Sequence, residues 1–175
     1  MPNLKQILQD HSLWLSSNKT KGKQTDLSNQ DLSGANLAYA NLSYANLENA
    51  NLTGANLTGA NLTYTNLYYA NLFRTNLDKA NLAYANLAYA NLENASLKDA
   101  NLENASLKDA SLYNANLTST NLENANLENV KGVQVFKCFY VENNEKKFNY
   151  FLHSVEAKKE MSKRLANRQC SWVEQ

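Results

Sequence analysis

The side chains that most often carry out catalysis are few in this chain and far apart. Two histidines, His11 and His153, stand near opposite ends of the 175 residues, and the only cysteines, Cys138 and Cys170, lie in the C-terminal part. The sequence offers no Ser-His-Asp arrangement, no phosphate-binding loop and no metal ligands at a usual spacing. We therefore expect no enzyme activity, no bound metal and no cofactor.

Charged residues are common but do not form one basic or acidic chain. The formal net charge is +1, composed of −6 over residues 25–129, +3 over residues 1–24 and +4 over residues 130–175. Such a balance does not favour binding to nucleic acid or to an anionic membrane. Several acids of the middle part occupy variable positions of a short repeat, which predicts a solvated face: Glu48, Glu93, Glu103, Glu123 and Glu128.

The cellular location is predicted from what the sequence contains at its start and along its length. The first fifteen residues, MPNLKQILQDHSLWL, have polar residues throughout and do not resemble a signal peptide. No stretch approaches the ~20 apolar residues that a membrane-spanning helix needs. Two thiols do not make a disulfide framework. These features predict a cytoplasmic protein that does not insert into a membrane.

A repeat of five residues dominates the middle of the chain. Leucine occupies every fifth position from Leu27 to Leu127, giving twenty-one consecutive units. Alanine stands two residues before leucine in sixteen units and asparagine stands directly before it in sixteen, whereas the two residues after it vary. The exceptions at the alanine position are Thr25, Gln30, Thr65, Thr75 and Thr120, and those at the asparagine position are Asp26, Asp31, Ser96, Ser106 and Ser111.

A period of five residues fits neither a flat strand nor a helix. In a strand, an odd period would place successive leucines on opposite faces. In an α-helix, each leucine would lie ~140° around the axis from the previous one. All leucines share one interior only if the chain turns once per unit, so the pattern predicts a solenoid of short extended sides.

The unit A(N/D)LXX, repeated without gaps over residues 25–129, resembles the pentapeptide-repeat family, of the leucine-centred kind common in cyanobacteria. The resemblance implies an all-β solenoid in which four units complete one turn of a right-handed quadrilateral β-helix. This chain would then form about five coils, with the leucine and the residue two before it pointing inward. We expect asparagine to bond nearby backbone at the turns and to form ladders between coils.

Both ends of a solenoid expose unpaired backbone and an open core, so we expect caps. Over residues 3–16, six residues fall on one face of a helix: Leu4, Ile7, Leu8, His11, Trp14 and Leu15. We therefore expect residues 1–24 to be a helical cap with a linker, in which His11 packs against the first coil.

The segment after the repeat, residues 130–175, is predicted to cap the other end or to mediate dimerisation. Residues 133–141 and 147–153 favour two strands, and residues 142–145 favour the turn between them.

A helix is expected to follow from Ser154 to about Arg168, which makes this an α/β cap. A single helix from about 145 to 168 is the alternative. Both alternatives leave open whether the protein is a monomer or a homodimer through this segment.

A coil of twenty residues would align tyrosines along one corner. Tyr44, Tyr64 and Tyr84 are spaced by twenty residues, and so are Tyr69 and Tyr89. One interpretation is that these rings only stabilise the stacked coils. The other is a protein-binding surface, because tyrosine and arginine are enriched at interaction hot spots. The candidate residues are Tyr44, Tyr64, Tyr68, Tyr69, Tyr84 and Tyr89, rimmed by Arg74 and Lys79.

The favoured hypothesis is a non-enzymatic scaffold that binds an unidentified protein partner. Resemblance to the quinolone-resistance branch of the family suggests an alternative, a DNA-mimicking modulator of a topoisomerase such as gyrase. The charge of −6 over residues 25–129 is low for such a mimic, and leucine stands where that branch often has phenylalanine. Direct binding to nucleic acid would require a basic stripe, which the acidic repeat lacks.

Overall fold

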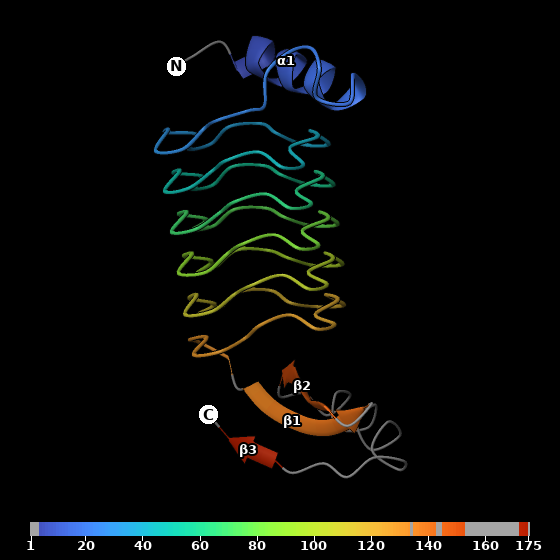
Figure 1. Ribbon diagram of the computed structural model, residues 1–175. Helices are drawn as coiled ribbons and strands as arrows, with labels where there is room; N and C mark the ends of the chain where they lie inside the picture. Colours follow the sequence, from blue (N-terminus) through green and yellow to red (C-terminus); the bar gives the residue numbers. More distant parts are fainter. Residues whose placement is uncertain (1–3, 134, 143–144, 153–171, 175) are drawn as a thin grey trace.

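The computed structural model describes residues 4–133, 135–142, 145–152 and 172–174, with side chains described over residues 4–133. The chain begins with helix α1 (Leu4–Ser16), continues through a stack of coils, and ends in strands β1 (Val135–Glu142), β2 (Glu145–Leu152) and β3 (Trp172–Glu174). Figure 1 shows α1 lying across one end of the stack and the strands following the other end.

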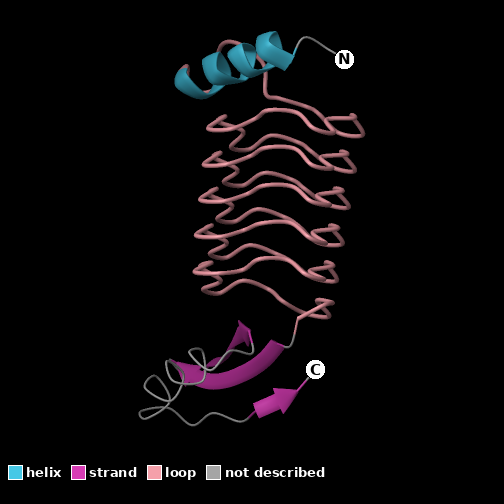
Figure 2. Cartoon of the chain, turned by 180° about the vertical axis from the view of Figure 1, so that it is seen from behind, coloured by secondary structure: helices cyan, strands magenta, loops and turns pink. Residues whose placement is uncertain are grey.

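Residues twenty apart pair in parallel all along the stack. The bridges run from Asp26↔Asn46 to Ser111↔Lys131, and they form four series because each coil contains four units. A typical unit donates from Leu47 N to Asn66 O at 2.7 Å, and Asn66 N donates back to Ala45 O at 3.0 Å. The predicted quarter-turn per unit is therefore confirmed, and the coils stack like rungs in both side views (Figures 1 and 2).

The leucines fill the interior, as their spacing predicts. Those from Leu27 to Leu112, and Leu127, are at most 2% exposed, whereas Leu117 and Leu122 are partly buried in the last coil. Alanines two residues before leucine complete the core where the walls approach, for example Ala50 and Ala70. This burial of apolar surface is the main favourable term for the stack.

Threonine replaces alanine at four inward positions without leaving most of its hydroxyls unsatisfied. Thr65 Oγ1 donates to Leu42 O at 2.8 Å, and Thr75 Oγ1 donates to Leu52 O at 2.7 Å. Thr120 makes the same bond to the carbonyl of Leu97. Thr25 lies in the first coil, and its buried hydroxyl has no partner among the described residues.

The asparagines that precede leucine have two roles, both predicted. The side-chain oxygen accepts a bond from the backbone two residues later, as in Tyr68 N→Asn66 Oδ1 at 3.2 Å. In several units the amide group also donates to the residue twenty positions earlier. One such ladder begins with Asn46 donating to Asp26 at 3.2 Å and continues with Asn66 donating to Asn46 at 3.1 Å. A second begins with Asn51 donating to Asp31.

Helix α1 covers the first coil with the face that the sequence predicts. Leu4, Ile7 and Leu8 pack against the leucine core, and His11 is fully buried. The His11 ring contacts the coil through both nitrogens: Nδ1 accepts from Thr25 N at 3.1 Å, and Nε2 lies 3.0 Å from Ser43 O. The expectation that His11 is a packed residue of the cap is thus met.

The C-terminal strands form one antiparallel sheet in the order β2-β1-β3. Strands β1 and β2 pair from Val135↔Leu152 to Glu142↔Glu145, which confirms the predicted hairpin with small shifts at its ends. The alternative helix from 145 is wrong for residues 145–152, which are strand. The predicted helix from Ser154 to Arg168 lies outside the described residues, and β3 was not predicted.

Candidate protein-binding surface

Each unit ends in a tight turn at a corner of the coil. The turn is closed by a backbone bond such as Ala50 N→Leu47 O at 3.0 Å, and its third residue, two after leucine, has a positive φ. Positive φ at the third turn residue but not at the second is typical of a type II turn, which favours glycine or asparagine at the third position. Seven of the twenty-one units have asparagine there and three have glycine, but six have tyrosine.

Tyrosine is unusual at these positions because its side chain cannot reduce the steric cost of the left-handed conformation. Tyr44, Tyr64 and Tyr84 have φ of 63°, 58° and 61°, and Tyr69 and Tyr89 have φ of 57° and 60°. Left-handed backbone costs an ordinary L-residue roughly 1–2 kcal/mol. The ladder on both sides of each turn holds the backbone in place, as it also does at Arg74, Lys79 and Ser119.

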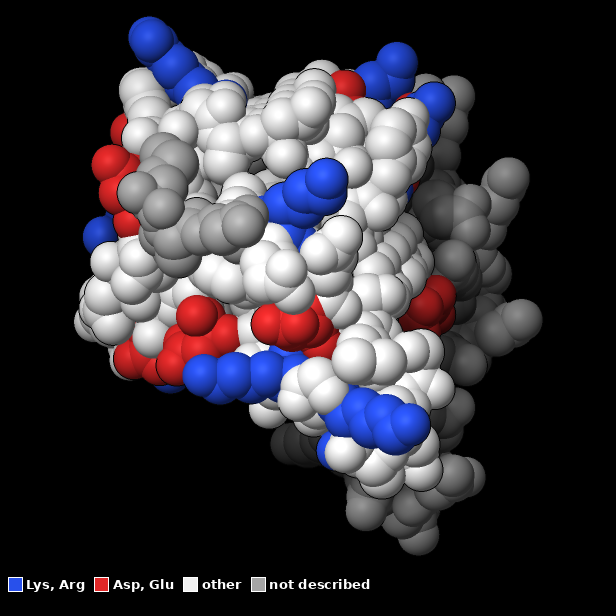
Figure 3. Space-filling view, turned by 90° about the horizontal axis from the view of Figure 1, so that it is seen from above, with Lys and Arg blue, Asp and Glu red and all other residues white. Residues whose placement is uncertain are grey.

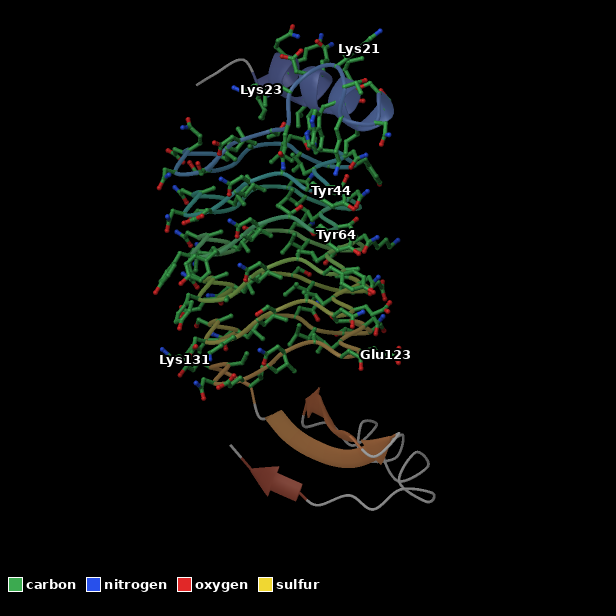
Figure 4. The ribbon with its side chains drawn as sticks, viewed as in Figure 1. Lys21, Lys23, Tyr44, Tyr64, Glu123 and Lys131 are labelled. Carbon is green, nitrogen blue, oxygen red and sulfur yellow. The ribbon has the colours of Figure 1, made fainter. Side chains whose placement is uncertain are left out.

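Three of these tyrosines form one continuous stack. The ring centroids of Tyr44 and Tyr64 are 5.0 Å apart and those of Tyr64 and Tyr84 are 4.8 Å apart, with interplanar angles of 6° and 10°. We call these three residues the tyrosine column. Figure 4 shows Tyr44 and Tyr64 one below the other at one edge of the stack, with Glu123 farther along that edge. Their faces cover one another, so the column presents ring edges and hydroxyls to solvent.

A second group of rings occupies the next corner. Tyr69 stacks on Tyr89 at 4.8 Å, and Tyr68 meets both rings edge-on at 4.6 and 5.5 Å. Burial and the neighbouring Tyr69 raise the pKa of the Tyr68 hydroxyl, and the carboxylate of Asp109 raises that of Tyr89. Both hydroxyls therefore stay protonated donors at neutral pH. We call Tyr68, Tyr69 and Tyr89 the tyrosine cluster.

The eight candidate residues do not lie at one corner. Four units make one coil, so units two apart lie on opposite sides of the stack. Arg74 belongs to the corner opposite the tyrosine column and Lys79 to the corner opposite the tyrosine cluster. Arg74 instead lies over its neighbour Phe73 at 5.0 Å. The column and the cluster occupy adjacent corners, and the side between them carries the amide ladder of Asn46 and Asn66.

The upper end of the column is closed by residues that the sequence analysis did not select. Lys19 Nζ lies 4.8 Å from the centre of the Tyr44 ring and 5.3 Å from that of Trp14. Trp14 in turn stacks on His11 at 5.6 Å. Only the fold brings this linker lysine to the column. The spacing of Tyr44, Tyr64 and Tyr84 pointed to the column itself but gave no signal for Lys19.

A sixth tyrosine at the same turn position stands apart from both groups. Tyr39 is 79% exposed, and its ring lies so close to Gly59 in the next coil that a Cβ there would come within 2.7 Å of it. The twenty-residue register pairs Tyr39 with glycine, so it gains no stacking partner below. The chain therefore contains a tyrosine in the same backbone setting but outside the stacked groups.

Charges around the two tyrosine groups are of mixed sign. Below the column and cluster stand Glu103, Asp109 and Glu123, whereas Lys108 pairs with Glu128 at 3.4 Å. Seen from the helix end, acidic and basic side chains are interspersed around the rim with wide uncharged areas between them (Figure 3). Around the two tyrosine groups themselves, uncharged tyrosine and asparagine side chains therefore outnumber the charged ones.

The described part of the chain contains no group of His, Cys, Asp or Glu residues that could hold a metal ion. The buried His11 uses both ring nitrogens for the cap. His153 and Cys170 lie outside the described residues. No helix within that same part is long and apolar enough to cross a bilayer.

Comparison with known protein families identifies the class of this chain. The family model for pentapeptide repeats matches eight copies, over residues 23–43, 40–78, 75–112 and 95–131, which together span more than half of the sequence. The chain therefore belongs to the pentapeptide-repeat family, whose members form right-handed quadrilateral β-helices. No curated protein matches the sequence.

Solved structures with a similar fold include several cyanobacterial pentapeptide repeat proteins. Rfr23 from Cyanothece 51142 is 29% identical, with a TM-score of 0.60, over 71% of this chain and 97% of its own. The protein alr5209 from Nostoc PCC 7120 is 32% identical, with a TM-score of 0.49, over 59% of this chain and 78% of its own. HetL from Nostoc sp. strain PCC 7120, which is involved in heterocyst differentiation regulation, is 34% identical over 62% and 60%, with a TM-score of 0.31.

Proposed function

We propose that this protein is a non-enzymatic scaffold that binds a protein partner through the side of the coil between the tyrosine column and the tyrosine cluster. The observation that carries the proposal is the use of tyrosine at five adjacent left-handed turn positions, where asparagine or glycine would hold the backbone with less strain. These five rings are 40–51% exposed. Stabilisation of the stack does not require so much aromatic surface to remain in contact with solvent.

The composition of this side supports a protein partner. Its outward residues are mainly tyrosine and asparagine, two residue types that are also enriched in antibody contact surfaces. Stacking holds each ring in one orientation, so little side-chain entropy is lost when a partner binds. The hydroxyls and ring edges can donate to backbone carbonyl groups of the partner.

The test uses a photo-reactive residue in place of Tyr64, introduced in the source organism, to crosslink and identify the partner. The purified partner is then titrated against the Tyr64→Asn/Tyr84→Asn double variant. Asparagine suits the left-handed turn, so the backbone should be retained. We expect the affinity to fall more than about tenfold, the range of hot-spot residues.

The matched control is Tyr39→Asn, which makes the same change at the same turn position outside the stacked groups. It should leave the affinity within about twofold of the original. Equal weakening by both variants, or an unchanged affinity in the double variant, would refute the proposed surface.

The alternative of a DNA-mimicking gyrase modulator has less support from the surface. The described carboxylates lie mainly in the later coils and are interspersed with Lys98 and Lys108. A gyrase supercoiling assay with and without a quinolone distinguishes the two functions, and the scaffold proposal expects no effect.

The oligomeric state, monomer or homodimer through residues 130–175, stays a prediction that light scattering can decide.

A further inference from the structure

The first coil has an open edge beneath α1. Some backbone groups at this edge have no earlier coil to pair with, whereas the equivalent groups of later coils do. In a later coil, Tyr64 N donates to Ala83 O and Thr65 N donates to Leu62 O. The corresponding acceptor and donor in the first coil are Ser43 O and Thr25 N. Both are satisfied by the ring of His11, at 3.0 and 3.1 Å. The imidazole therefore replaces two backbone hydrogen bonds of later coils: the one between coils at Ser43 O and the one within a turn at Thr25 N.

These two contacts fix the protonation state of the ring. Thr25 N–H is a donor, so Nδ1 must be unprotonated to accept from it. The proton of the neutral ring then sits on Nε2, from which it donates to Ser43 O. A second proton on Nδ1 would face the Thr25 N–H group and replace an attraction with a repulsion between two donors.

We propose that His11 is a proton-sensitive latch, which holds α1 on the first coil when its ring is neutral and releases the cap when Nδ1 is protonated. The release would uncover Thr25 N and Ser43 O, and it would remove Trp14 from the lysine, Lys19, that lies over the Tyr44 ring. This inference concerns the cap and does not depend on the proposed partner-binding surface.

Among the described residues, no carboxylate bonds to the His11 ring to compensate for a second proton. Asp10 accepts a bond from Gln6 Nε2 at 3.0 Å on the exposed side of α1, and Asp26 accepts from Ser28 N. Burial lowers the pKa of His11 from its usual value near 6.5, and the backbone bond to Ser43 offsets this only in part. The other ionisable groups on α1, the linker and the first coil are Lys5, Lys19, Lys21, Lys23, Asp31, Tyr39 and Tyr44.

The sign of the pH effect follows from the lowered pKa. The unfolded or released cap takes up a proton more readily than the docked cap, so docking is favoured above about pH 6.5 and weakens as the pH falls below it. For a single proton, the loss cannot exceed tenfold per pH unit.

The experiment measures amide hydrogen exchange of the full chain by NMR from pH 7.5 to pH 5.0, expressed as protection factors corrected for intrinsic rates. We expect the protection of Thr25 and of α1 to fall together by up to about tenfold per pH unit, while amides of middle coils such as Leu62 and Leu82 stay constant. Ring nitrogen shifts should show protonated Nε2 and unprotonated Nδ1 at pH 7.5.

The matched variant is His11→Gln, whose amide can donate and accept but does not titrate in this range. It should dock the cap with protection independent of pH, and middle-coil amides report whether it folds. The latch is refuted if Thr25 protection in the original protein does not change with pH, or if it falls equally in His11→Gln.

Discussion

At the scale of single residues, the repeat shows how one side-chain position adapts to its place in the stack. Thr65 and Thr25 are both buried, at 0% and 2% exposure, and both replace alanine two residues before a leucine. The hydroxyl of Thr65 reaches the carbonyl of Leu42 in the preceding coil. Thr25 has no preceding coil, and its hydroxyl is unpaired among the described residues. Identical residues at equivalent positions therefore differ in their contribution to stability.

This difference predicts opposite results for the same substitution at two sites. Thr65→Val keeps the shape but removes the bond to Leu42 O, so it should lower the free energy of unfolding by about 1 kcal/mol. Leu42 O keeps its turn bond from Ala45 N, which limits the loss. Thr25→Val removes a buried hydroxyl without a bond and should be neutral or stabilising. Urea unfolding of the two variants measures both; a larger loss from Thr25→Val would contradict this account.

At the scale of elements, side chains bond to groups of the first coil that have no preceding coil to pair with. Helix α1 supplies His11 to the open edge of the first coil. Two amide ladders begin in this coil with Asp26 and Asp31, which accept from Asn46 and Asn51. Hydrogen bonds to these carboxylates, chiefly from Ser28 and Ser33, lower the pKa of both aspartates.

The lowered pKa of Asp26 predicts an acid-dependent contribution to stability. Its charged form is favoured in the folded state, so this contribution is present above the usual value of about 3.8 and is lost as the pH falls below it. Asp26→Asn, which restores the residue found in most later units, should reduce the slope of stability against pH between about pH 4 and pH 2. Thermal unfolding across this range tests it, with Asp10→Asn on α1 as the control. An unchanged slope in Asp26→Asn would refute the role of this carboxylate.

At the scale of the whole molecule, the repeat determines a register rather than a particular length. The leucine period predicted a turn in every unit and a leucine core, and the family resemblance supplied the four units per coil. Together they predicted the amide ladders and the stacking of Tyr44, Tyr64 and Tyr84. The contact of Lys19 with Tyr44 was not predictable, because it depends on how the linker returns over the coil. The separation of Arg74 and Lys79 from the tyrosines followed from the register, but only when all four corners were placed together.

The register makes a prediction about deletions. Residues 91–110 repeat the same ten-residue sequence twice and form a whole coil of twenty residues. Their removal should leave a cooperatively folded protein with the tyrosine contacts intact and a urea m-value reduced in proportion to the lost coil. Removal of residues 91–100 alone should also fold, but it turns everything after the cut half a turn about the axis. Circular dichroism and crosslinking between Tyr84 and the Glu123 position distinguish the two, and failure of the twenty-residue deletion to fold would refute the register.

The amide ladders also give the rod chemically different ends. An asparagine side chain donates toward the preceding coil and accepts from the following one, whereas an aspartate can only accept. Both ladders that start in the first coil begin with an aspartate. No earlier repeat side chain lies beyond it to accept a hydrogen bond, so a donor group is not needed at this position. Asp26 and Asp31 are the only aspartates that directly precede a leucine of the repeat, so in this chain the ladder end that can only accept hydrogen bonds lies at the coil covered by α1.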